Sequence, residues 1–72
     1  MTIIQLETFL KIEELKSFSL AANDLGYAQS TVTMQIKQLE EELGTELFNR
    51  LGKTISLTPS GERLVDYLHK LP

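Results

Sequence analysis

Apolar residues along this chain recur mainly at helical spacing, in segments separated by short polar breaks. The first predicted helix covers residues 3–15, where apolar side chains at 3, 6, 9, 10 and 12 form a broad stripe. Thr2 and Gln5 before and within its first turn match the pattern of a capping box. Lys16 and Ser17 interrupt the stripe, and a second short helix is predicted over residues 18–25.

Gly26 follows the second helix, and glycine is the residue that best tolerates the left-handed backbone needed for a sharp turn. A third helix is predicted over residues 29–43 and ends at Gly44. One face of this helix is apolar, and the other carries side chains that are mostly short or hydrogen-bonding. The apolar face holds Val32, Ile36, Leu39 and Leu43, and the polar face holds Ser30, Thr33, Met34, Lys37 and Gln38.

The remaining third of the chain predicts a hairpin and a fourth helix. Ile55 and Leu57 alternate with polar residues, as in a short strand, and Gly52 marks a turn between basic residues. We therefore expect a two-stranded wing over residues 47–57. Thr58 and Pro59 open the fourth helix, with threonine as the cap and proline at the first helical position. Its apolar stripe consists of Leu64, Val65, Leu68 and Leu71.

These elements indicate a mainly α fold, with a three-helix core, a small wing and a further helix. The length of 72 residues allows one domain. Without cysteine, neither a disulfide framework nor a zinc finger can contribute stability. No apolar tract is long enough to span a membrane and no signal peptide is visible, so we expect a cytoplasmic protein with no membrane partner.

Net charge argues against nucleic acid at first sight, because the chain carries −3 and has a pI of about 5.0. DNA-binding domains are typically basic. The position of the charges changes this picture, since residues 29–37 contain no acid and end at Lys37. Glu40, Glu41 and Glu42 follow at the other end of the same helix, where they would repel phosphates. Only the front of the third helix is therefore expected to enter a DNA groove.

Residues 17–43 then form a predicted helix-turn-helix, in which the third helix reads the major groove. Gln29 can pair with adenine, Met34 can touch a thymine methyl, and Lys37 is a candidate for phosphate. For Arg50 on the wing, a structural salt bridge with a nearby glutamate is a serious alternative to a DNA contact. The candidate DNA-binding residues are Gln29, Ser30, Thr31, Thr33, Met34, Lys37, Arg50 and Lys53.

Other classes of function find less support. His69 is the only histidine, without the convergent partners that catalysis or metal binding needs, and the glycines form no phosphate-loop spacing. We expect no enzyme, no cofactor and no metal site. The alternative from a different class is a protein-interaction module, which would dimerise through the leucine stripe of the fourth helix and never touch DNA.

Five short motifs resemble the N-terminal domain of LysR-type transcriptional regulators. They are AA-x-x-L at 21–25, Q-S-T-V-T-x-Q-I at 29–36, LE-x-x-LG at 39–44, LF-x-R at 47–50 and LT-x-x-G at 57–61. The resemblance implies a winged helix-turn-helix over residues 1–57 that binds double-stranded promoter DNA as a homodimer. Residues 58–72 would begin the dimerising linker helix, with contacts from Leu64, Val65, Leu68 and Leu71.

Family members usually continue into a C-terminal domain that binds a small-molecule effector. That domain is absent from these 72 residues, so we expect the chain to be the DNA-binding part alone. Three positions depart from the family pattern. Ala28 replaces a common serine, Ser30 a usual proline and Met34 a frequent arginine, which changes the helix cap, its entry into the groove and the base preference.

Overall fold

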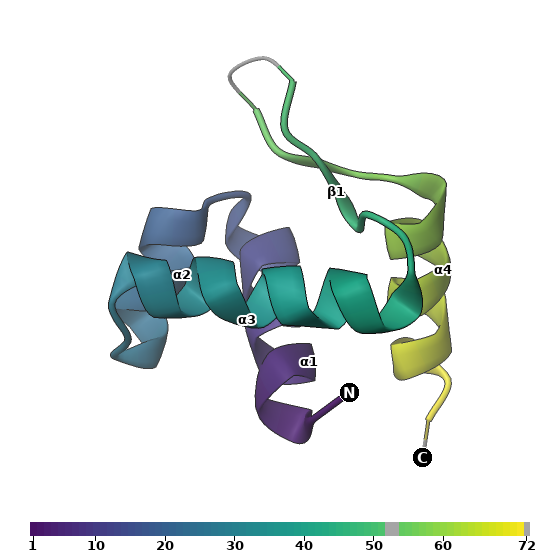
Figure 1. Ribbon diagram of the computed structural model, residues 1–72, viewed down its shortest axis with the longest axis horizontal. Coiled ribbons are helices and arrows are strands. Elements are labelled where there is room, and N and C mark those ends of the chain that lie inside the picture. The colour runs from purple at the N-terminus through teal and green to yellow at the C-terminus, as the bar shows by residue number, and fades with distance from the viewer. Residues whose placement is uncertain (52–53, 72) are drawn as a thin grey trace.

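The computed structural model describes residues 1–51 and 54–71. Helix α3 crosses the front of the molecule in Figure 1, with α1 and α2 behind it and the hairpin projecting to one side. The N-terminus and the end of α4 lie on the side opposite the hairpin. The elements are α1 (Ile3–Leu15), α2 (Phe18–Leu25), α3 (Gln29–Leu43), β1 (Phe48–Asn49), β2 (Ser56–Leu57) and α4 (Pro59–His69). The predicted winged helix-turn-helix is confirmed.

Short polar side chains fix where most of these helices begin. The capping box of α1 forms as predicted between Thr2 and Gln5, with both hydrogen bonds at 3.1 Å. Ser17 caps α2 by accepting the Leu20 N–H at 3.1 Å, and Thr58 caps α4. Helix α3 is the exception, because Ala28 provides no side-chain hydrogen bond to its first turn.

The core is built where α1, α2 and α3 cross, and the base of the hairpin completes it. Val32, Ile36 and Leu39 of α3 are fully buried, as the apolar spacing predicts. Phe48 of β1 packs against two other aromatic rings in tilted and edge-to-face arrangements, with centroids 5.3 Å from Phe9 and 5.7 Å from Phe18. Because β1 pairs antiparallel with β2 while Phe48 reaches into the core, the wing starts from a fixed base.

Three apolar residues lie outside the positions predicted for them. Ile3 is 75% exposed, because the helical turn of 100° per residue places it roughly 120° around α1 from buried Phe9. Leu43 lies in the last turn of α3 and is 39% exposed. Leu71 falls beyond the end of α4 at His69, so it is not part of the helical stripe.

Polar contacts also hold the helices together, and the sequence pattern did not reveal them. Thr8 of α1 is fully buried and donates to the Gln35 side chain of α3 at 2.6 Å. Lys11 of α1 lies 3.3 Å from Asp24 of α2. The hydrogen bond and charge of Asp24, with a contribution from Glu14, raise the pKa of Lys11 above its usual value.

Helix α4 packs very closely against the base of the hairpin. The Thr58 N–H donates to the Leu47 carbonyl at 3.0 Å, and its hydroxyl donates to the Glu46 carbonyl at 2.6 Å. One turn on, Gly61 lies so close that an added Cβ would be 2.2 Å from the same Leu47 oxygen. In the described part of the chain, no helix has the length and apolar content needed to cross a membrane.

Candidate nucleic-acid interface

The side chains of α3 outside its buried apolar face divide into three rows, because residues three, four or seven apart lie on one face of a helix. The outward row contains Ser30, Met34 and Lys37, all of them exposed. A second row points toward the hairpin and contains Gln29, Thr33 and Glu40. The third row faces α1 and contains Thr31, Gln35, Gln38 and Glu42.

The outward row brings three chemically different side chains together, and all of them are exposed. Met34 is 53% exposed between the hydroxyl of Ser30 and the amine of Lys37. Lys37 makes no ion pair with any residue in 1–51 or 54–71, so its charge is not neutralised by a described neighbour. This row can therefore present a hydroxyl, an apolar thioether and a cation to one ligand surface.

The row that faces the hairpin borders a groove of about 450 Å³. The groove lies between the start of α2, the front of α3 and the hairpin, which brings together segments that are far apart in the sequence. Its described lining includes two cations and no acid. The lining residues are Lys16, Ser17, Phe18, Ser19, Gln29, Thr33, Arg50, Thr54 and Ile55.

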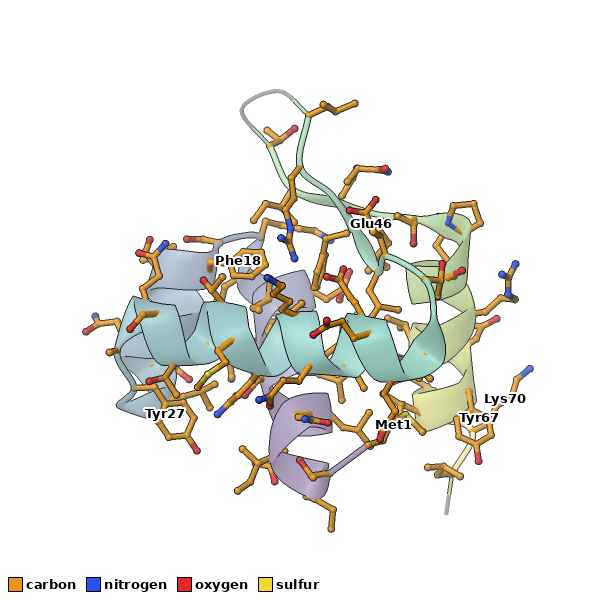
Figure 2. All side chains as sticks on the ribbon, viewed as in Figure 1. Met1, Phe18, Tyr27, Glu46, Tyr67 and Lys70 are labelled. Atoms are coloured by element: carbon orange, nitrogen blue, oxygen red, sulfur yellow. The ribbon has the colours of Figure 1, made fainter. Side chains whose placement is uncertain are left out.

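Arg50 is held in this groove by two different contacts. Its guanidinium nitrogen Nη2 donates to Glu40 Oε1 at 3.2 Å, so the salt bridge expected as a rival role for Arg50 does form. Its guanidinium carbon also lies 5.1 Å from the centre of the Phe18 ring. Figure 2 shows Phe18 between α2 and the base of the hairpin. Arg50 thereby links the hairpin to both helices of the helix-turn-helix while 44% of its side chain stays exposed.

The three consecutive glutamates near the end of α3 point in different directions, which the sequence pattern alone did not reveal. Glu40 points to the hairpin and its side chain is only 12% exposed. Glu42 pairs with the amino group of Met1 on the far side of the helix. Glu41 remains exposed on the outward side, so it is the glutamate that marks the end of the acid-free surface.

Some predicted site residues lie elsewhere or outside the described residues. Thr31 is half-buried on the row that faces α1, away from the hairpin groove. Lys53 lies outside the described residues. Leu64, Val65 and Leu68, predicted as dimer contacts, are partly buried against the chain's own core. On the outer side of α4 the exposed groups include Tyr67 and Lys70 (Figure 2).

The groove also includes residues that sequence reasoning missed. Lys16, Ser17, Ser19 and Thr54 line it, and none of them was among the candidate DNA-binding residues. Lys16 lies 2.7 Å from Glu13, so a neighbour already compensates part of its charge. For Lys16, Ser17 and Ser19 the signal in the sequence was their position around the start of α2, where the first N–H groups of a helix have no partner within the helix.

Comparisons with known proteins agree in family and fold. A family model described as bacterial regulatory helix-turn-helix protein, lysR family, matches residues 3–62. The uncharacterised HTH-type transcriptional regulator YwqM of Bacillus subtilis is 51% identical over 71 residues, which cover 99% of this chain and 24% of that protein. The HTH-type transcriptional regulator CzcR of the same organism is 45% identical, over 99% of this chain and 25% of its own length. The chain thus spans about a quarter of the length of these curated relatives.

Solved structures give the same result. The crystal structure of a LysR-family transcriptional regulator from Eggerthella lenta superposes with a TM-score of 0.93 at 33% identity, covering 97% of this chain and 100% of that one. The BenM DNA-binding domain in complex with catB site 1 DNA gives a TM-score of 0.91 at 37% identity, covering 97% and 78%. In that second structure the matching domain is bound to DNA.

Proposed function

Because this chain belongs to the LysR family of bacterial helix-turn-helix regulators, we propose that it binds double-stranded promoter DNA in a sequence-specific manner. The observation that carries the proposal is the joint exposure of the acid-free front of α3 and the groove that contains Lys16 and Arg50. The BenM domain, which has the same fold and is bound to DNA in its own structure, supports it.

In the proposed complex, the front of α3 enters the major groove and the wing lies on the flanking backbone or minor groove. Base readout is assigned to Gln29, Ser30, Thr33 and Met34, where Met34 offers an apolar contact for a thymine methyl. Phosphate contacts are assigned to Lys37, Arg50 and Lys53, with Lys16 added from the groove. Thr31 is kept only as a contact from the edge of the helix, because it is half-buried.

We further propose that two copies act together and that α4 begins the dimer contact. Leu64, Val65 and Leu68 already pack on the chain's own core, so the partner would meet their outer edges together with Tyr67 and Leu71. Two such domains would occupy half-sites about one helical turn, roughly 34 Å, apart. A small-molecule effector would act through parts of the regulator outside these 72 residues, and the protein would work in the cytoplasm, where the promoter DNA is.

The test is a binding titration with duplexes selected from a random pool by this chain. We expect Gln29→Ala and Thr33→Ala to weaken binding and to broaden the base preference, because both side chains lie at the proposed contact surface. Gln38→Ala is the matched control, since it removes an amide of the same type from the row that faces α1. Equal effects of Gln29→Ala and Gln38→Ala would show that the site assignment is wrong.

If the pool yields no preferred sequence and no duplex binds, the proposal itself fails and a protein-interaction role gains support. Chain association measured by sedimentation would then decide that role. Substitution of Tyr67 on the outer side of α4 should weaken association if that face carries the contact.

A further inference from the structure

Glu40 joins the recognition helix to the hairpin through both oxygens of its carboxylate. Oε2 accepts the Leu47 N–H at 2.7 Å, and Oε1 accepts from Arg50 at 3.2 Å. Leu47 is 1% exposed, so this N–H has little access to water. A buried donor of this kind is normally satisfied, and here the side chain of α3 satisfies it across seven residues.

These contacts orient Arg50 and leave most of its guanidinium N–H donors without a described partner. A guanidinium has five N–H donors in a fixed plane, and the described contacts engage one of them, with Glu40. The Phe18 ring contacts the guanidinium through its π face and consumes no donor. The remaining donors are on a side chain that lines the groove beside Gln29 and Thr33.

We propose that Glu40 is a positioning residue for DNA binding: its carboxylate holds Arg50 in the orientation in which the free guanidinium donors meet a DNA phosphate. This inference rests on the proposed function. It assigns a favourable role to an acid near a polyanion, where charge alone predicts repulsion. Affinity for DNA gains because the long, flexible Arg50 side chain is already ordered before DNA binds. Less conformational entropy is then lost on binding.

The substitution Glu40→Gln separates the two contacts of the carboxylate. The single amide oxygen can still accept the Leu47 N–H, which keeps the hairpin anchored to α3. The amide nitrogen then faces the guanidinium, donor against donor, and Arg50 is released. Glu41→Gln is the matched control, because it removes the same charge from the next residue of the same helix, where the side chain is exposed.

The experiment combines these variants with Arg50→Ala and measures affinity for a duplex selected by the wild-type chain. In the wild type and in Glu41→Gln, Arg50→Ala should weaken binding about tenfold, as the loss of a charge-assisted phosphate contact does. In Glu40→Gln the same substitution should weaken it less than about threefold, because the two residues act as one unit. Glu40→Gln alone should weaken binding, whereas Glu41→Gln should leave it unchanged or strengthen it.

Thermal unfolding of each variant shows whether the domain remains folded, and the ¹⁵N-labelled Arg50 side chain gives a readout without DNA. Its Nε–Hε signal should become more mobile in Glu40→Gln but not in Glu41→Gln. Equal effects of Arg50→Ala in all backgrounds, or tighter binding by both glutamine variants, overturn the role of Glu40 while DNA binding stands. If the wild type binds no duplex, the proposed function fails, and the role of Glu40 toward DNA is overturned with it.

Discussion

Replacing Gly61 by alanine tests the closeness of α4 to the hairpin. Alanine is favoured over glycine inside a helix by about 0.8–1.0 kcal/mol, so Gly61→Ala would stabilise an open helix. Here the new Cβ would lie 2.2 Å from the Leu47 oxygen and 2.9 Å from a Leu57 methyl group. The oxygen cannot simply turn away, because it also accepts the Thr58 N–H at 3.0 Å.

Helix α4 must therefore move outward by roughly 1 Å, which is the difference from an ordinary contact distance. Overpacking of this kind costs about 1–3 kcal/mol, and a weakened buried hydrogen bond adds about 1–3 kcal/mol. After the gain in helix propensity is subtracted, we expect a net loss of about 3 kcal/mol in the free energy of unfolding. That is a large share of the roughly 5–15 kcal/mol typical of a folded domain.

Urea unfolding followed by circular dichroism measures this loss. Gly44→Ala is the comparison, because nothing lies within 4 Å of its added Cβ and the only penalty is its φ of +71°. That penalty is about 1–2 kcal/mol. A Gly61→Ala protein that is as stable as the wild type, or more stable, would refute the close approach of α4 to Leu47.

Three further predictions concern the recognition helix. Ala28→Ser should stabilise the chain by about 1 kcal/mol and raise its Tm by about 4–8 °C, since α3 lacks a side-chain cap; an unchanged Tm would contradict this. Thr8→Val should lower the free energy of unfolding by about 1–2 kcal/mol in urea, because Gln35 loses its partner in the helix interface; a neutral effect would count against that contact. In a salt titration of DNA binding, the slope of log K against log salt should be only about −3 to −4 per monomer, as few cations are available, and a slope near −9 would show that many more phosphates are contacted.

Most of the fold could be predicted from local sequence signals. The spacing of Val32, Ile36 and Leu39 defines the inner face of α3, and the residues at 2 and 58 identify helix starts because their hydroxyls accept backbone N–H groups. These signals depend on neighbours within one helical turn, so no tertiary information is required. The motifs that resemble the LysR family cover the same segments and led to the same architecture.

The site was only partly predictable, since its geometry depends on residues distant in the chain. Residues 40–42 look alike in the sequence, yet successive 100° rotations send Glu40 to the hairpin and Glu42 to the amino terminus. The leucine stripe of α4 was equally ambiguous, because helical spacing reveals an apolar face but not what covers it. In the structure Leu64 and Leu68 pack partly on the domain's own core.

Chemical-shift mapping of the ¹⁵N-labelled chain with a selected duplex tests the central claim most directly. We predict the largest shifts at the backbone amides of residues 29–37, with further shifts at 16–19 and at Arg50 and Thr54, and small shifts along α4. Shifts concentrated on α4 around Tyr67, with residues 29–37 unchanged, would contradict DNA recognition by the front of α3.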